Sequence, residues 1–183
     1  MVMPLLDGPF LFLRHGQTAQ NAAGLVCGAT DVPLDDTGRA QAARAAEHLR
    51  ARPPGSIWTS TLARARSTAD IVGAATGLVP QVLAGLAERN WGAWEGGPRD
   101  ALDRDAVPPG GEGPEAFRDR VLVALAQIDG PATPLIVAHS GTARVIHAHL
   151  TGASFTRLQN GQLVDWRRDE ARWHCHTIVK DGC

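Results

Sequence analysis

Two short apolar runs constrain the fold most strongly, because each of them ends at a histidine. Residues 10–13 are all apolar and are followed by Arg14 and His15, and Pro134–Ala138 is followed by His139. Runs of this kind are typical of buried strands, and the polar break places side chains at the end of the strand. Open α/β sheets bind their ligands at that edge. The pattern therefore predicts an α/β protein in which the two histidines meet at one site.

The segments between the two runs predict further secondary structure. Helices are expected where apolar residues recur with a helical period, at residues 38–50, 62–75, 114–128 and 141–150. The first would be capped by Asp36 or Thr37, and the second would end at Gly77. Strands are expected at residues 56–60 and 79–83. The C-terminal part predicts an antiparallel pair, 161–166 and 173–179, joined by a polar turn around Arg168 and Asp169.

Composition restricts the classes of function. The chain has 183 residues, enough for one buried core, so we expect a single domain over residues 1–183. A net charge of -1 offers no general attraction for nucleic acid or an anionic membrane, and we expect neither partner. No apolar run approaches the roughly 20 residues of a membrane span, and the N-terminus lacks a secretory signal pattern. Three cysteines without disulfide-like spacing fit a reducing compartment, which predicts a cytoplasmic protein.

An arginine beside a histidine suits an anionic phosphate group. The guanidinium of Arg14 offers a fork of donors, and a neutral His15 offers a nucleophilic nitrogen. Arg64 falls in the first turn of the helix expected at residues 62–75, where free N–H groups favour an anion. From these residues alone an ordinary interpretation remains open for each group. Arg14 and His15 would be solvated polar residues at the end of a strand, and Arg64 would be a surface arginine on a helix.

Four motifs in order resemble those of the histidine phosphatase superfamily, the phosphoglycerate mutase-like proteins. The opening motif is Leu-Arg-His-Gly-Gln-Thr at residues 13–18, continued by Asn21 and by Cys27-Gly28. The other three are an arginine motif at residues 60–65, an acidic motif at 86–96 and a second histidine motif at 137–141. The match extends from about Phe10 to about His149. It implies a three-layer α/β/α domain with a mostly parallel central sheet.

The resemblance also implies a role for each matching residue. His15 would accept the phosphoryl group, while Glu88 would protonate the leaving group and then activate water. The negative charge of the phosphate would be cancelled by Arg14, Arg64 and His139. Further substrate contacts are expected at Asn21, Gly28 and Ser140, whereas Glu95 resembles a structural position. This chemistry requires no metal and no cofactor, so we expect neither.

Three functions compete on this scaffold: a phosphatase, a mutase and a non-catalytic interaction protein. The complete set of motif residues argues against the third. Mutases of the superfamily carry a longer insertion with paired arginines after the acidic motif, whereas only 51 positions (139 minus 88) separate Glu88 from His139. The short segment and the Gly-Gly-Glu at residues 110–112 resemble the alpha-ribazole and broad-specificity phosphatases. We therefore expect hydrolysis of a small phosphate monoester, and leave the substrate and the oligomeric state open.

Two groups of residues allow two interpretations each. Trp91 and Trp94, in the loop expected at residues 85–97, either anchor that loop or line a substrate pocket, and anchoring is favoured. The sequence His174-Cys175-His176 has the composition of a metal site. In an alternating strand, however, Cys175 points away from both histidines, so ordinary strand residues are the preferred interpretation.

Overall fold

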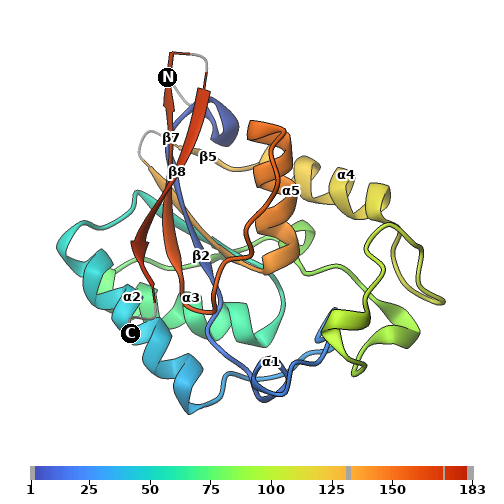
Figure 1. Ribbon diagram of the computed structural model, residues 1–183. Helices are drawn as coiled ribbons and strands as arrows, with labels where there is room; N and C mark the ends of the chain where they lie inside the picture. The colour runs from blue at the N-terminus through green and yellow to red at the C-terminus, as the bar shows by residue number, and fades with distance from the viewer. Residues whose placement is uncertain (1–2, 131–132, 171, 181–183) are drawn as a thin grey trace.

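The computed structural model describes residues 3–130, 133–170 and 172–180, and a six-stranded sheet forms the centre of this part (Figure 1). The strand order is β4-β3-β6-β2-β7-β8. Neighbours from β4 to β2 are parallel, whereas β7 is antiparallel to both β2 and β8. The strands are β2 (Phe10–Arg14), β3 (Ser56–Thr59), β4 (Gln81–Val82), β6 (Pro134–Ala138), β7 (Leu163–Asp169) and β8 (Arg172–Val179). The expected mostly parallel sheet is confirmed.

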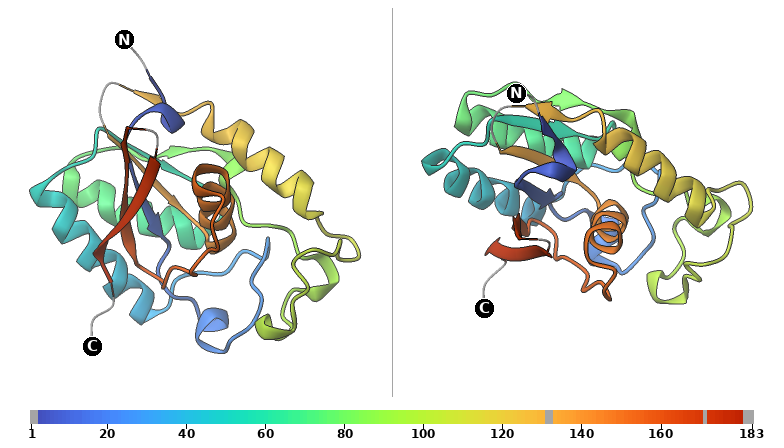
Figure 2. Two further views of the ribbon diagram at one scale, coloured as in Figure 1. Left: turned by 45° about the horizontal axis from the view of Figure 1, so that its top comes forward. Right: turned by 90° about the horizontal axis from the view of Figure 1, so that it is seen from above.

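Two helices cover each face of the sheet. They are α2 (Asp36–Ala51) and α3 (Ala63–Thr76) on one face, and α4 (Pro114–Leu125) and α5 (Ser140–Thr151) on the other. Figure 1 shows the sheet between these pairs, with α2 and α3 at lower left, and Figure 2 shows the same layers from two further directions. Each pair of helices shares its own cluster of buried residues with the sheet. The three-layer α/β/α arrangement is therefore confirmed.

The alternation of side chains along the central strands explains their unbroken apolar sequence. In β2, Phe10 and Phe12 belong to the cluster beneath α4 and α5, whereas Leu13 belongs to the cluster beneath α2 and α3. Strand β6 divides in the same way, with Ile136 on the first face and Val137 on the second. Because successive side chains point to opposite faces and both faces are covered, every position must be apolar.

Several predicted boundaries shift. The helix expected from residue 38 begins at Asp36, and its cap is Asp35, whose side chain accepts the Gly38 N–H at 2.7 Å. The caps proposed at Asp36 and Thr37 are therefore wrong. The strand expected at residues 79–83 shrinks to the exposed edge strand β4, and α4 ends at Leu125 rather than near residue 128.

The C-terminal hairpin is longer than predicted. Strand β7 continues through Asp169, so the expected turn around Arg168 and Asp169 is wrong: Arg168 pairs with Trp173 instead. The imidazoles of His174 and His176 lie 6.2 Å apart, as neighbours on one face should, and His174 Nε2 lies 2.8 Å from Asp169 Oδ1. No group of three or more potential metal-ligating side chains occurs in the described part of the chain.

Short elements complete the described chain. They are β1 (Met3–Pro4), η1 (Leu5–Asp7), α1 (Ala19–Ala22), η2 (Ala84–Leu86), η3 (Gly92–Trp94), η4 (Arg99–Ala101) and β5 (Asp129–Gly130), which pairs with β1. Sequence patterns did not indicate the β1–β5 pair. None of the helices in the described ranges is long and apolar enough to cross a membrane.

Two long connections lie side by side beyond the carboxyl ends of the parallel strands. One contains α1 and follows β2, and the other covers residues 84–113 (Figures 1 and 2). They are joined by an isolated bridge between Leu25 and Pro98, and the Val26 N–H donates to the Gly97 carbonyl at 2.9 Å. These connections form a wall around the sheet edge at which the sequence predicts the site.

Candidate active site

Three neighbouring parallel strands end in polar side chains at one place. Strand β2 leads into His15, β6 into His139 and β3 into Ser60. The His15 N–H donates to the Ala138 carbonyl at 2.9 Å, so the first residue after β2 is still paired with β6. The two imidazole centroids lie 5.1 Å apart. The expectation that both histidines meet at this sheet edge is confirmed.

The hydrogen bonding of His15 leaves one ring nitrogen free. Its Nδ1 lies 2.7 Å from the Gly16 carbonyl oxygen, which can only accept, so we assign the proton to Nδ1 and the lone pair to Nε2. Burial, followed by the charges of Arg64 and Arg14, holds the pKa of His15 well below its usual range. A neutral imidazole with a free Nε2 is the nucleophilic form.

The backbone around His15 is held by close packing and by distant side chains. A Cβ atom at Gly16 would lie 2.2 Å from the Gly38 carbonyl oxygen, so only glycine allows this approach to α2. The Gly16 N–H donates to Thr68 Oγ1 at 3.1 Å, and Asn160 Nδ2 donates to the His15 carbonyl at 3.1 Å. Thr68 and Asn160 were not predicted, because each comes from a distant segment and carries no local pattern.

Arg14 and Arg64 are buried cations with unused donors. Arg14 Nη1 donates to the Leu158 carbonyl at 2.6 Å, and Arg64 donates to the Thr30 and Gly28 carbonyls at 2.9 and 2.7 Å. The Nε of each is buried and lacks a hydrogen-bond partner among the described residues. Burial, followed by the charge of Arg157, lowers the pKa of Arg14 to about 9. An anion would satisfy both donors and compensate both charges.

His139 is held by one hydroxyl group. Its Nε2 lies 2.7 Å from Ser60 Oγ, and that oxygen also accepts the Leu62 N–H at 3.3 Å. We assign the hydroxyl proton of Ser60 to the hydrogen bond with Nε2, which places the imidazole proton on Nδ1. That Nδ1 is buried and has no partner within the described ranges. Burial, then Arg64 and His15, keep the pKa of His139 well below its usual range.

Glu88 is fixed by two backbone donors. Its Oε1 accepts the Arg89 N–H at 2.9 Å, and its Oε2 accepts the Gly141 N–H at 3.0 Å. A Cβ atom at position 141 would lie 2.0 Å from Glu88 Oε1, so the carboxylate depends on glycine at the start of α5. Each carboxylate oxygen retains a second lone pair for a proton or a water.

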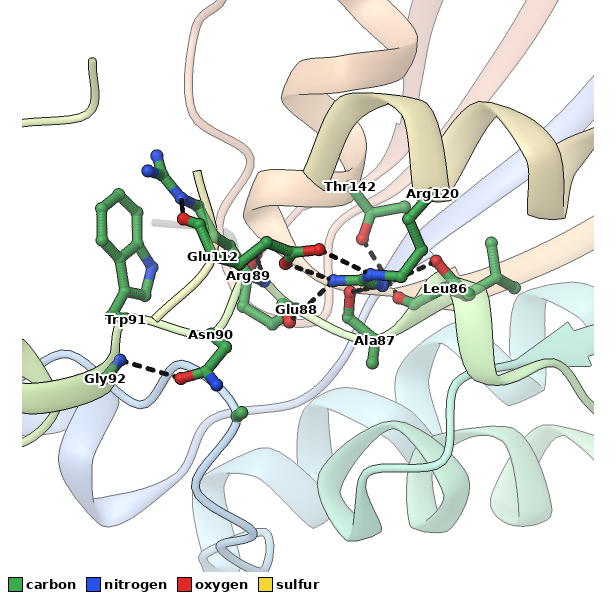
Figure 3. A network of polar contacts seen from close by, with 12 residues as sticks. Leu86, Ala87, Glu88, Arg89, Asn90, Trp91, Gly92, Glu112, Arg120 and Thr142 are labelled. Carbon is green, nitrogen blue, oxygen red and sulfur yellow. Dashed lines mark hydrogen bonds and ion pairs between the residues drawn. The ribbon is translucent and has the colours of Figure 1, made fainter. Parts of the chain in front are cut away.

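Two arginines brace the segment that carries Glu88 (Figure 3). Arg120, from α4, donates to the Gly85 and Ala87 carbonyls at 2.9 and 3.1 Å, and forms two hydrogen bonds to the carboxylate of Glu112. Arg89 donates to three carbonyls, those of Glu112, Arg104 and Ala106. The Gly-Gly-Glu recognised at residues 110–112 thus supplies the acid that orients Arg120. The bracing roles of both arginines were not predicted.

Glu95 is structural, as expected. Its carboxylate accepts the N–H groups of Ala29 at 2.7 Å, Thr30 at 2.8 Å and Trp91 at 3.0 Å, and so ties the two long connections together. Gly28 has a φ of 56°, and a Cβ there would lie 2.1 Å from Glu95 Oε1, so this glycine is required for the junction.

A cavity of about 600 Å³ opens over these groups. Of the predicted site residues, seven line it: Arg14, His15, Asn21, Gly28, Arg64, Glu88 and Ser140. His139 is fully buried next to His15 and is not on the cavity wall. Asn21 is already partnered, since its amide donates to Cys27 Sγ at 3.3 Å and accepts from Asn160 Nδ2 at 3.0 Å. Trp91 both lines the cavity and stacks on Trp94, whereas Trp94 only packs.

The cavity is strongly basic, which sequence reasoning missed. Eight arginines line it, against the two carboxylates Glu88 and Asp105. Besides Arg14, Arg64 and Arg89 they are Arg99, Arg104, Arg118, Arg144 and Arg157. These five lie in loops and helices without a recognisable motif, so only the fold brings them to one place.

A neutral histidine set among buried arginines, with a carboxylate on the wall of the same cavity, is the arrangement expected of an enzyme that acts on a phosphate group. Residues 10–181 match the histidine phosphatase superfamily (branch 1), and the chain belongs to that superfamily. It is a phosphate monoester hydrolase, like its named relatives in the family, one of which is a metal-independent phosphatase.

Two relatives and one solved structure illustrate the match. The chain is 37% identical to glucosyl-3-phosphoglycerate phosphatase of Mycobacterium tuberculosis, over 89% of this chain and 85% of that protein. It is 32% identical to a metal-independent phosphoserine phosphatase of Arabidopsis thaliana, over 79% and 69% of the two chains. The structure of the mycobacterial glucosyl-3-phosphoglycerate phosphatase with VO3 superposes with a TM-score of 0.79, at 29% identity, over 96% and 100% of the two chains.

Agropine synthesis reductase of Rhizobium rhizogenes contains a similar segment. It is 34% identical over 93% of this chain, which spans 42% of the length of that protein.

Proposed function

We propose that the protein hydrolyses a small phosphate monoester through a phosphohistidine at His15 Nε2. The observation that carries the proposal is the hydrogen bond from His15 Nδ1 to the Gly16 carbonyl at 2.7 Å, because it leaves Nε2 as the only basic ring nitrogen. Unpartnered Nε atoms of Arg14 and Arg64 support the same role, since they are suited to phosphoryl oxygens.

In the first step the lone pair of His15 Nε2 attacks phosphorus, and the N–P bond forms as the bond to the ester oxygen breaks. Arg14 and Arg64 cancel charge on the phosphoryl oxygens. The proton on His139 Nδ1 supplements them. Glu88 gives its proton to the departing alkoxide, which leaves as an alcohol.

In the second step water attacks the phosphohistidine. The Glu88 carboxylate takes a proton from the water, the N–P bond breaks, and inorganic phosphate leaves with His15 neutral again. Asn21, Gly28 and Ser140, which line the cavity, are assigned to substrate contact. The same carboxyl group thus serves as acid and then as base.

The test is to trap the intermediate. Wild-type protein mixed in EDTA with a phosphate ester labelled in its phosphoryl group, and quenched in alkali, is expected to retain label that acid releases. His15→Ala should retain none. Label that survives acid, or that remains on His15→Ala, would contradict the assignment.

Phosphoryl transfer of the mutase type is the alternative. Between Glu88 and His139 the described residues hold η3, η4, α4, β5 and β6, with no further inserted element to cover the cavity, so hydrolysis is favoured because water can reach the intermediate. Assay with 3-phosphoglycerate distinguishes the two, since a mutase would give isomerised product faster than free phosphate.

We also propose that residues 1–183 form one domain and that the enzyme is cytoplasmic, as the cysteine usage predicts. Cell fractionation tests the location.

A further inference from the structure

Four arginines of the cavity are not used by the proposed chemistry. We call Arg99, Arg104, Arg144 and Arg157 the arginine rim; all four line the same cavity as His15. They come from η4, from the loop after it, from α5 and from the connection between α5 and β7. Their convergence on one cavity needs an explanation, because like charges repel when they are brought together.

The arginine rim differs from the arginines that hold the fold. Arg89 and Arg120 are saturated by hydrogen bonds to carbonyls and to Glu112. Arg118, which also lines the cavity, pairs with Asp119 at 2.9 Å. Arg89 and Arg120 therefore need no ligand, and Arg118 has a carboxylate at hydrogen-bond distance.

Members of the arginine rim lack comparable partners. Within the described part of the chain the exposed Arg104 and the half-buried Arg157 make no side-chain hydrogen bond or ion pair. Arg144 lies over the Phe155 ring at 4.9 Å, a contact that leaves its N–H groups unused. Arg99 has a single carboxylate at 3.9 Å, on Asp100, whose side chain is 98% exposed, so this pair is weak.

The charges of the arginine rim act on one another. Burial, and then the charge of Arg104, lowers the pKa of Arg144. Burial, and then Arg99, lowers the pKa of Arg157, which in turn lowers that of Arg14. Arg157 is therefore the member of the arginine rim whose charge acts on Arg14, and both side chains line the same cavity.

We propose that the substrate carries a second anionic group, a carboxylate or a second phosphate, which the arginine rim binds while the scissile phosphoryl group lies at His15. This inference rests on the proposed function and specifies its substrate class. Guanidinium groups match both anions through paired N–H donors. The volume of about 600 Å³ leaves room for a substrate that spans the two positions.

The experiment compares pairs of esters that differ only in the second anion. The carboxylate pair is 3-phosphoglycerate and glycerol 3-phosphate, and the phosphate pair is fructose 1,6-bisphosphate and fructose 6-phosphate. A charge-assisted hydrogen bond gained by one member should raise kcat/KM by about tenfold or more. The pair with the larger ratio identifies which anion the arginine rim accepts.

Variants show which residues produce the difference in kcat/KM between the two esters of a pair. Replacing both Arg144 and Arg157 by Gln should lower that ratio by about tenfold, because the second anion loses its donors. Arg66→Gln, an exposed arginine on α3 outside the cavity, is the matched control and should leave the ratio as it is. A ratio near one for both pairs in the wild-type protein, or an equal fall in Arg66→Gln, would overturn the proposal.

If the phosphatase assignment itself were wrong, the results would differ from those of a failed arginine-rim proposal. In that case no ester, including p-nitrophenyl phosphate, would be hydrolysed and His15 would not be labelled. Calorimetric binding of 3-phosphoglycerate and glycerol 3-phosphate would then still test the arginine rim, since it predicts tighter binding of the first.

Discussion

Ser60 Oγ lies 2.7 Å from His139 Nε2, so a hydroxyl group at the end of β3 is the hydrogen-bond partner of the second histidine. The same oxygen accepts the Leu62 N–H at 3.3 Å, and we assign its own proton to the hydrogen bond with the imidazole. Ser60 is completely buried and does not line the cavity. We therefore regard it as a positioning residue that acts through His139.

Ser60→Ala should slow turnover without removing any group that contacts the substrate. It leaves His139 Nε2 buried without a donor, at a cost of about 1–3 kcal/mol in the free energy of unfolding. The proton is then no longer confined to Nδ1. Nitrogen chemical shifts of His139 check this directly: the wild-type protein should show a protonated Nδ1 and the variant a mixture. An unchanged tautomer in an impaired variant would indicate a merely structural role.

Gly141→Ala should impair catalysis through Glu88. The new methyl group would meet Glu88 Oε1, a flexible side-chain end that can move aside, so the thermal midpoint should change little while kcat falls. A loss of about 10²–10⁴-fold is expected for an alkyl phosphate, the usual contribution of one proton-transfer group. Because both changes act on one carboxyl group, Gly141→Ala combined with Glu88→Gln should be no slower than Glu88→Gln alone. Additive losses would show that Gly141 acts elsewhere.

Glu88→Gln should be sensitive to the leaving group. It keeps the nucleophile but loses the proton donor, so phosphorylation by an alkyl phosphate should slow much more than phosphorylation by p-nitrophenyl phosphate, whose phenolate needs little protonation. Single-turnover measurements with both substrates test this, and slow water activation should let the phosphohistidine accumulate. Equal impairment on both substrates would transfer the acid role to another group.

The buried histidines should make the protein less stable as the pH falls. The pKa values of His15 and His139 lie well below the value of about 6.5 expected in the unfolded chain, so only the unfolded state takes up their protons just below that pH. The free energy of unfolding should therefore fall from about pH 6.5 downward, by at most about 1.4 kcal/mol per pH unit for each histidine. Urea unfolding at pH 7.5 and 5.5, in buffers without phosphate, measures this slope. His139→Gln should show a shallower slope than the wild-type protein.

Much of the site could be predicted from the sequence because its central residues follow local patterns. The apolar runs before His15 and His139 are strands buried on both faces, and Arg64 does lie in the first turn of a helix. The supporting residues could not be predicted. Asn160 reaches His15 from a loop near β7, and Ser60 reaches His139 across two paired strands, so only tertiary structure reveals their roles.

The incorrect secondary-structure predictions also arise because tertiary structure overrides the local sequence pattern. Arg168 and Asp169 look like turn residues, yet they lie in β7 because pairing with β8 satisfies their backbone and leaves both side chains exposed. The apolar segment around Val79 suggests a strand, but Val79 is 86% exposed and β4 keeps only two residues at the sheet edge. The arginine rim was missed because it depends on the fold and on no spacing in the sequence.

The nucleophile and the proton donor belong to regions that should differ in local stability. The amide of His15 extends the backbone ladder between β2 and β6, whereas the Glu88 segment is held largely by the side chains of Arg120 and Arg89. Amide hydrogen exchange should therefore be slowest at His15, close to the global unfolding limit, and faster along residues 84–92. Fluctuations that open the second segment would withdraw the acid and base while the nucleophile stays in place. Such an open state could still be phosphorylated by an activated ester but would release phosphate slowly.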